Sequence, residues 1–256
     1  MNNFSFSVAM SVYYKDNAVF FDRALQSITE RQTVKPTEIV LVCDGSLNEQ
    51  LDAVIDKYRK QYPIFKILRL KDNGGLGNAL KLAVENASNE IIARMDSDDI
   101  SVSDRFEQQL KFFSNHPEVD IVGGNITEFI GDEKKRCAFN HMSVMYKKSA
   151  IRAAGGYLDW FWNEDYYLWI RMQLYGFIFA NTGTVLVNVR VGEEMYQRRG
   201  GSAYFKSEKK LQDYMLKHKM INKITYVNNV GKRFVVQMLL SNRVRGWVFR
   251  KFARSD

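Results

Sequence analysis

Four short apolar runs, each followed by a segment long enough for a helix, shape the first hundred residues of the chain. The runs cover residues 7–14, 38–43, 65–70 and 90–95. Helix-like segments cover 18–31 and 47–62, and a third follows a glycine-rich loop and ends at about 87. Runs this short do not make globular helices, and strands that alternate with helices form parallel sheets through right-handed crossovers. The sequence therefore predicts an α/β fold with a mostly parallel sheet flanked by helices.

Three carboxylates, Asp96, Asp98 and Asp99, follow the fourth apolar run. Ligands of open α/β sheets bind at the carboxyl ends of strands, and alternation along an extended segment directs Asp96 and Asp98 to the same side. Their repulsion favours a bound cation or ligand hydroxyl groups. Mn²⁺ or Mg²⁺ suits such a site, because both prefer oxygen ligands and also bind phosphates. The alternative is that Asp98 or Asp99 caps a helix over 102–115.

The regular alternation stops after this helix. Further strands are expected over 119–123, 126–130, 139–146 and 185–191, with a short helix over 147–154 and another that begins near residue 164. The hydrophobic fraction of 46% and only three prolines argue against disorder. Two cysteines are too few for a disulfide framework, and no secretory signal or membrane-spanning run is present. We therefore expect a protein that is cytosolic, or attached to a membrane surface without spanning it.

Other polar residues at predicted strand and helix ends are candidates for binding or catalysis. Asp44 starts a turn after the second strand, and its carboxylate could accept hydrogen bonds from a base or a ribose. The glycine-rich loop 73–78 matches no phosphate-binding pattern, which favours a backbone-shaping role. Glu164 and Asp165 fit the first turn of a helix capped by Asn163, and either could instead deprotonate a nucleophile.

The remaining candidates each have an ordinary alternative. The pair Arg198 and Arg199 suits bidentate binding of phosphate, or forms a solvated basic loop. His141 is either packed or in contact with a ligand. The two tryptophans of the segment 159–165 would stack on a sugar or pack into the core.

Taken together, these segments resemble the family 2 glycosyltransferases of GT-A (Rossmann-like) fold. The resemblance covers roughly residues 5–200 and is most specific at 9–13, 38–45, 93–99, 155–157 and 164–166. Residues 139–141 and 198–201 are similar to the subgroup that builds bacterial amylovoran, capsule and O-antigen polysaccharides. On this basis residues 1–203 form the catalytic domain, with a nucleotide-sugar half to about 100 and an acceptor half after it. Residues 204–256 form a basic helical extension.

The resemblance implies roles for individual residues. Asp44 would bind the base of a UDP-sugar in a pocket lined by Val12 and Tyr13. Asp96 would contact the nucleoside and ribose, and Asp98, with Asp96, would hold Mn²⁺ or Mg²⁺ on the diphosphate. The phosphate contacts would include Arg198 and Arg199. The base that deprotonates the acceptor hydroxyl would be Asp165, with Glu164 as neighbour or substitute.

A single base acting opposite a diphosphate leaving group implies direct displacement with inversion at the anomeric carbon. The Gln-x-x-Arg-Trp motif of processive relatives is absent, since residues 197–199 have no tryptophan partner, so one sugar is expected per event. The connection over 129–139 is shorter than this subgroup implies. The expected acceptor is a hydroxyl of a glycan or of a lipid-diphosphate-linked sugar.

The C-terminal tail concentrates the positive charge. Residues 205–256 hold 13 Lys and Arg against 3 Asp and Glu, so that the net charge of +8 leaves about −2 for the rest. Aromatic residues among these arginines favour an interfacial helix on anionic lipid, and a solvated helical extension is the alternative. With such a helix, we expect a cytoplasmic protein that is peripheral on the inner face of the cell membrane. A nucleic-acid-binding protein would leave the acids unexplained. A sugar nucleotidyltransferase would carry a glycine-rich basic loop near the N-terminus, and residues 13–17 contain no glycine.

Overall fold

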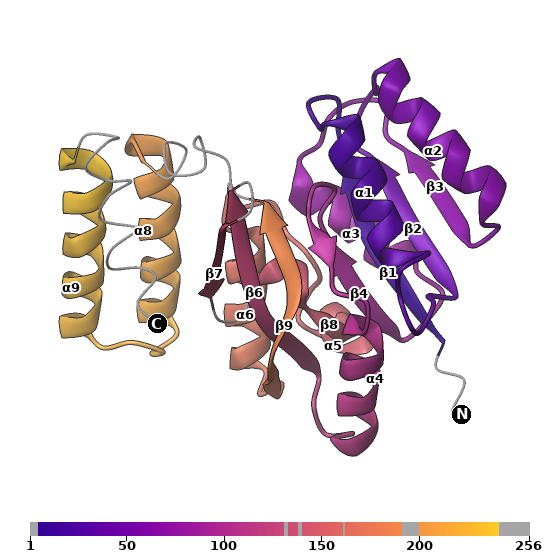
Figure 1. Ribbon diagram of the computed structural model, residues 1–256. Coiled ribbons are helices and arrows are strands. Elements are labelled where there is room, and N and C mark those ends of the chain that lie inside the picture. The colour runs from indigo at the N-terminus through magenta and orange to yellow at the C-terminus, as the bar shows by residue number, and fades with distance from the viewer. Residues whose placement is uncertain (1–4, 131–132, 138–139, 161, 191–199, 241–256) are drawn as a thin grey trace. The chain divides into compact units, whose positions relative to one another are not determined.

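The structure is a computed structural model that describes residues 5–130, 133–137, 140–160, 162–190 and 200–240 (Figure 1). The chain divides into two compact units. The first consists of Met1–Asp159 and Arg171–Arg190, and the second of Trp160–Ile170 and Val191–Asp256. Within the described ranges, no helix has the length and hydropathy needed to cross a bilayer.

The first unit contains the predicted parallel sheet. Its four strands lie in the order β3-β2-β1-β4 and are all parallel to their neighbours. They are β1 (Phe6–Val12), β2 (Glu38–Cys43), β3 (Phe65–Arg69) and β4 (Ile91–Met95), connected by α1 (Ala18–Ile28), α2 (Glu49–Gln61) and α3 (Leu76–Asn86). The side chains of Asn17 and Asn48 cap α1 and α2 by accepting backbone N–H groups. The α/β prediction is confirmed for this half of the sheet.

The sheet continues beyond β4 with mixed strand directions. The order after β4 is β8 (Met145–Lys147), β6 (Ile121–Ile130), β9 (Phe179–Arg190) and β5 (Ile100–Ser101), and β7 (Glu133–Cys137) also pairs with β6. Strand β8 is antiparallel to both neighbours, whereas β6 and β9 run parallel. Two further helices belong to this unit, α4 (Arg105–Asn115) and α5 (Lys148–Ala153).

Several predicted boundaries beyond β4 were wrong. The helix expected over 102–115 begins at Arg105, because Ile100 and Ser101 pair with β9 before the chain turns. The strands expected over 119–123 and 126–130 form one strand, β6, which continues through a bulge. The strand expected over 139–146 is a 3₁₀ turn (η1, His141–Ser143) followed by β8, and its first residue lies outside the described ranges. The strand expected over 185–191 begins earlier, at Phe179.

A buried arginine joins α4 to the centre of the sheet. The guanidinium of Arg105 donates to the backbone oxygens of Arg94 (2.7 Å) and Val144 (3.2 Å), and its Nε donates to Gln109 (3.0 Å). The amide of Gln109 in turn donates to the backbone oxygen of Val122 (3.0 Å). Burial, together with the charge of Arg94, lowers the pKa of Arg105 to about 9. These bonds hold α4 against the end of β4.

The second unit is helical. It contains α8 (Ser202–Lys217), α9 (Lys223–Phe234), a π-helical turn η2 (Val235–Leu239) and the start of α6 (Glu164–Leu174). Its core consists of Trp160, Ile170 and Leu211. The helical character predicted for the C-terminal extension is therefore confirmed over the described residues 202–239.

Gly124 lies at the bulge in β6, where a side chain would have no space. A Cβ built at this position would lie 2.3 Å from Cδ1 of Leu186, whose side chain is fully buried in β9. We expect Gly124→Ala to reduce the free energy of unfolding by about 1–3 kcal/mol through overpacking. Urea unfolding followed by circular dichroism measures this change. Gly74→Ala is the matched control, because its Cβ would make only ordinary contacts. Equal midpoints for the two variants would contradict the prediction.

Candidate active site

The carboxyl ends of β1, β2 and β4 meet at one edge of the sheet. Val12 pairs with Cys43 of β2, and Met10 pairs with Met95 of β4, so the residues after each strand are neighbours. The amide of Asp44 also donates to the backbone oxygen of Val12 (2.8 Å). This edge is where ligands bind in open α/β sheets. The structure thus brings the predicted residues at the ends of these three strands to one place.

Asp44 organises the glycine-rich loop. One carboxylate oxygen accepts the amide of Gly74 (2.7 Å), and the other accepts the amide of Gly75 (3.0 Å). The next residue, Gly45, has φ +87°, and its missing Cβ would lie 3.0 Å from the backbone nitrogen of Asn73. Two loop amides are therefore bound by a protein carboxylate, which agrees with a backbone-shaping role. Each carboxylate oxygen keeps a lone pair for a further donor.

Asp96 is paired with a buried arginine. Its Oδ1 lies 2.5 Å from the guanidinium of Arg94, whose side chain is only 2% exposed. Burial alone would lower the pKa of Arg94, but the carboxylate of Asp96 raises it, so that the guanidinium stays charged. Arg94 was not a candidate from the sequence, because it lies within an apolar run. The only signal was a single cation two residues before the first acid.

Asp16, which sequence reasoning did not select, joins the acidic edge. Its Oδ2 accepts the hydroxyl of Ser97 (2.7 Å) and the amide of Tyr13 (3.1 Å). Burial raises the pKa of Asp16 to about 6, and the charge of Asp96 contributes. Burial also raises the pKa of Asp98 to about 6, with further contributions from Asp96 and Asp16. Ser97 thus contacts a carboxylate that interacts electrostatically with both Asp96 and Asp98.

Asp99 is held by the last strand of the sheet. Its Oδ1 accepts the amide of Arg190 (2.8 Å), and the Nε of Arg190 donates to the backbone oxygen of Asp98 (3.2 Å). Burial, Asp96 and Asp98 raise the pKa of Asp99 well above its ordinary value. The helix-cap alternative for Asp98 and Asp99 was wrong, because α4 begins at Arg105 after the strand β5.

A neutral histidine lies behind the acids. His141 is buried, and its Nε2 lies 2.8 Å from the hydroxyl oxygen of Tyr157. Burial and the charge of Arg94 hold the pKa of His141 well below its ordinary value, so that the ring stays neutral. The packed alternative therefore describes His141 in this structure.

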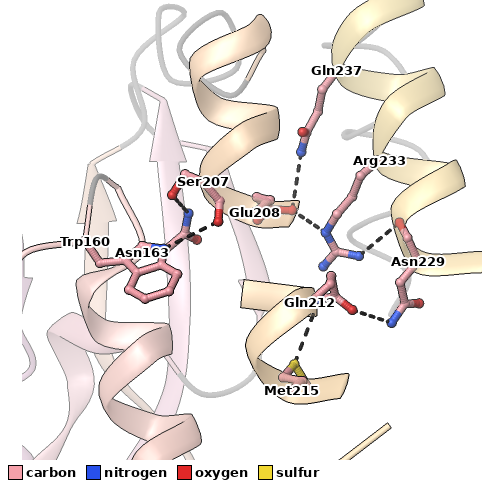
Figure 2. Close-up of polar contacts among 9 residues, drawn as sticks. All are labelled: Trp160, Asn163, Ser207, Glu208, Gln212, Met215, Asn229, Arg233 and Gln237. Atoms are coloured by element: carbon pink, nitrogen blue, oxygen red, sulfur yellow. Dashed lines mark hydrogen bonds and ion pairs between the residues drawn. The ribbon is translucent and has the colours of Figure 1, made fainter. Parts of the chain in front are cut away.

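In the second unit, the predicted acids lie at the start of α6. Glu164 and Asp165 are in its first turn, and Oδ1 of Asp165 accepts the amide of Tyr166 (2.8 Å). The side-chain amide of the preceding Asn163 donates to the hydroxyl of Ser207 in α8 (3.0 Å), as Figure 2 shows. This bond ties the residue before the two acids to α8.

The two tryptophans of this segment have different surroundings. Trp160 is packed, because its Nε1 donates to the backbone oxygen of Ser207 (3.4 Å) and Nζ of Lys210 lies 4.2 Å from its ring centroid. Trp162 is 46% exposed and has φ +60°, which is unusual for a residue other than glycine. Trp162 is therefore the more accessible ring for a sugar. Arg198 and Arg199 lie outside the described residues.

The acids of the β4 edge have the chemistry of a site for a hard cation. In the part of the chain that the structure describes, no group of three or more His, Cys, Asp or Glu residues is arranged to hold a metal ion. Mn²⁺ or Mg²⁺, however, commonly uses one or two carboxylates and completes its shell with phosphate and water. Oδ2 of Asp99 is also buried without a hydrogen-bond partner among the described residues. Asp96 and Asp98 therefore fit a cation that arrives with a diphosphate.

Comparison with known proteins decides the family. Residues 7–179, more than half of the chain, match the model of the family described as Glycosyl transferase family 2. The chain belongs to this family. The resemblance inferred from the motifs is thus confirmed, and the protein is a glycosyltransferase rather than a sugar nucleotidyltransferase or a nucleic-acid-binding protein.

Two relatives cover most of this family 2 glycosyltransferase. The amylovoran biosynthesis glycosyltransferase AmsE of Erwinia amylovora is 37% identical over an alignment of 230 positions, and the match covers 83% of this chain and 85% of AmsE. An Escherichia coli protein named UDP-Gal:alpha-D-GlcNAc-diphosphoundecaprenol beta-1,3-galactosyltransferase is 35% identical over an alignment of 268 positions, and the match covers 97% of this chain and 96% of that protein. These identities extend through the C-terminal helices in the second case.

The fold of the family 2 glycosyltransferase is also that of a solved structure. The crystal structure of S. aureus TarS 1–349 in complex with UDP-GlcNAc matches with a TM-score of 0.70 at 16% identity, and it covers 97% of this chain and 76% of that one. The predicted α/β, GT-A-like architecture is confirmed by this similarity.

Asp16 gives this edge a measurable pH dependence. Its folded pKa of about 6 lies above its ordinary value of 3.8, so its contribution to stability is complete below pH 4 and is lost as the pH rises through 6. We expect Asp16→Asn to reduce the fall in the free energy of unfolding between pH 4 and pH 7 by about 1–3 kcal/mol. Urea unfolding at several pH values, with metals chelated, measures this.

Ser97→Ala is the complementary variant. This substitution removes the hydrogen bond that lowers the pKa of Asp16, so the pKa rises further. The free energy of unfolding of the variant should therefore fall more with rising pH than that of the wild type. Parallel pH profiles for the wild type and both variants would show that Asp16 does not titrate in this window.

Proposed function

We propose that the protein is an inverting, metal-dependent, non-processive glycosyltransferase. It moves a sugar from a UDP-sugar to a hydroxyl of a lipid-diphosphate-linked glycan during surface polysaccharide or O-antigen biosynthesis. The observation that carries this proposal is the acidic edge at the end of β4, where burial and mutual repulsion raise the pKa of Asp98 and Asp16 to about 6. Such an edge is suited to a cation and a diphosphate rather than to folding alone.

The base and ribose of the donor would lie beside β1 and β2. Asp44 is held by two loop amides and still has lone pairs for a base N–H, and Val12 and Tyr13 would line the same pocket. Asp96 would receive the ribose hydroxyls from the other side, with its charge balanced by Arg94. The S. aureus structure that shares the fold was solved with UDP-GlcNAc, which supports a UDP-sugar as donor.

Asp98, with Asp96, would hold Mn²⁺ or Mg²⁺. When bound, such an ion offsets the negative charge that develops on the departing UDP. Asp98 must be ionised to ligate it, and a cation opposes the burial and repulsion that raise its pKa. Arg198 and Arg199 would supply further phosphate contacts.

Asp165 would act as the catalytic base, with Glu164 as its neighbour or substitute. The base takes the proton of the acceptor hydroxyl while the acceptor oxygen attacks the anomeric carbon. The bond from that carbon to the diphosphate oxygen breaks on the opposite side, so the configuration inverts and UDP leaves. Both acids lie in the first turn of α6, and their carboxylates are the kind of group that accepts the proton of a hydroxyl nucleophile.

The relatives guide the choice of acceptor and the place of action. The E. coli relative is named for transfer to a sugar on diphosphoundecaprenol, and the Erwinia relative for amylovoran biosynthesis. A lipid-linked acceptor places the enzyme at the cytoplasmic face of the membrane, and we propose that the basic aromatic tail binds anionic lipid there. That tail, residues 243–254, lies outside the described residues. We further propose residues 1–203 as the catalytic domain, with a nucleotide-sugar half to about 100 and an acceptor half after it, and 204–256 as a basic extension.

Calorimetric binding of UDP tests the donor site. We expect UDP to bind more tightly with Mn²⁺ than without it, and Asp98→Asn to lose the metal-dependent part, at least tenfold in affinity, because one carboxylate ligand is removed. Asp104→Asn is the matched control, since Asp104 is exposed and its side chain caps nothing. Metal-independent binding that is equal in all three proteins would refute the metal role.

Transfer kinetics test the base. We expect Asp165→Asn to reduce kcat by about 10²–10⁴-fold while binding of UDP stays unchanged, because no base then takes the proton from the hydroxyl of the sugar acceptor. Glu164→Gln is measured beside it. If only the Glu164 variant loses activity, the base is Glu164, and if neither does, the assignment of a base to α6 is wrong.

A further inference from the structure

Helix α9 packs on α8 through polar side chains. Figure 2 shows Arg233 paired with Glu208, and the amide of Asn229 donating to Oε1 of Gln212 (2.9 Å). One turn further on, Gln237 donates to the same carboxylate as Arg233 (3.3 Å). The side of α9 that faces α8 is therefore mainly polar, with one aromatic contact between Phe234 and Phe205 of α8 (ring centroids 5.6 Å apart).

The opposite side of α9 and η2 is apolar and open to water. None of the α9 residues is buried, and the exposed fractions are 74% for Ile224 and 64% for both Val227 and Leu239. Phe234, Val235 and Met238 are also exposed, by 41% to 47%, and Phe234, which contacts Phe205 of α8, lies at the edge of this side. These six residues, the α9 face, recur at spacings of three, four and seven, which places them on one side of the helix.

This arrangement is the reverse of an ordinary surface helix. A surface helix of a water-soluble domain turns its apolar stripe to the core and its polar residues to solvent. Single exposed apolar side chains need no explanation, but six on one side of a helix whose polar side makes the internal contacts form a continuous patch. The α9 face is thus suited to surroundings less polar than water.

Charge indicates what those surroundings are. From Tyr214 to Ser255 the sequence has ten Lys and Arg and no Asp or Glu. Two of these, Lys223 and Lys232, are exposed, and helical spacing places them on the two margins of the α9 face. A protein partner of ordinary composition would meet basic margins with mixed charges. An anionic lipid surface presents only negative charge to the basic margins, and the apolar side chains can enter the layer below its headgroups.

We propose that α9 and η2 form an interfacial membrane-binding helix. The α9 face enters the boundary between headgroups and acyl chains, Lys223 and Lys232 lie at the level of the anionic headgroups, and the polar side stays bonded to α8. This inference rests on the membrane association proposed above. It adds a folded binding surface, formed by residues 223–239, to the C-terminal tail.

Vesicle co-sedimentation of the full-length protein tests the proposal. The probes are vesicles of phosphatidylglycerol and phosphatidylethanolamine, with pure phosphatidylcholine as the neutral comparison. We expect a variant with Ile224→Ser, Val227→Ser and Leu239→Ser to lose at least tenfold in apparent affinity for the anionic vesicles. A variant with Lys223→Gln and Lys232→Gln should lose about fivefold per lysine on anionic vesicles only.

The matched control replaces three exposed apolar residues of the first unit, namely Val19, Leu174 and Ile178, by serine. This control should bind vesicles like the wild type. All variants should keep the wild-type Tm, because the substituted side chains are exposed. An equal loss of affinity in the control, or wild-type binding by the α9-face variant, overturns the proposal.

Three further measurements distinguish lipid binding by the α9 face from binding by the tail, from a covered face and from self-association. A tail variant with Trp247, Phe249 and Phe252 replaced by serine should keep part of its affinity for the vesicles. If this variant loses all vesicle binding while the α9-face variant binds like the wild type, the tail binds the lipid and the proposal is overturned. A lowered Tm of the α9-face variant would show that other parts of the same chain cover the α9 face. A lowered molecular mass of this variant in analytical ultracentrifugation, without loss of vesicle binding, would show that the α9 face is an interface between copies of the chain. Either result overturns it. UDP binding is measured on the same samples, and its absence beside intact vesicle binding contradicts only the proposed donor site.

Discussion

The ion pair between Arg94 and Asp96 is the interaction on which the acidic edge depends. A guanidinium buried in the middle of the sheet requires a counter-charge, and Asp96 supplies it at 2.5 Å. Burial and the charge of the same guanidinium hold the pKa of His141 well below its ordinary value, so that its ring stays neutral. Because Arg105 binds the backbone oxygen of Arg94, the pair is also fixed to α4. The acids beyond it can then be held close together, at the cost of raised pKa values for Asp16 and Asp98.

The sequence was informative where the structure is local and repetitive. Apolar runs of strand length located β1 to β4, and their order along the chain predicted which ends meet, so the edge with Asp44 and Asp96 followed. The partners of side chains were not predictable, because they depend on tertiary distances. Nothing near Asp16 in the sequence indicates Ser97, which is 81 residues away. The boundaries predicted for the strands after β4 were wrong for a similar reason. Strands β5 and β8 have only two and three residues, and they form by pairing with strands that are distant in the sequence.

The C-terminal helices show what hydrophobic periodicity alone does not predict. The spacing of Ile224, Val227 and Phe234 in the sequence indicates an amphipathic helix but does not say which side faces the protein. Only the contacts of Arg233 and Asn229 with α8 show that the polar side does. The composition of the tail led to the expectation of lipid binding. The α9 face is a second candidate surface for it, and this one is defined by the structure.

Asp44 also links the carboxyl edge of the sheet to helix α3. Helix α3 has glycine at its N-cap position, so it has no side chain of its own to satisfy the first amides. The carboxylate of Asp44, at the end of β2, binds the amides of Gly74 and Gly75 instead and places negative charge at the positive end of the helix dipole. The cap of α3 is thus supplied by a strand 31 residues earlier. One side chain therefore joins the start of α3 to the carboxyl edge of the sheet, so that the order of each depends on the other.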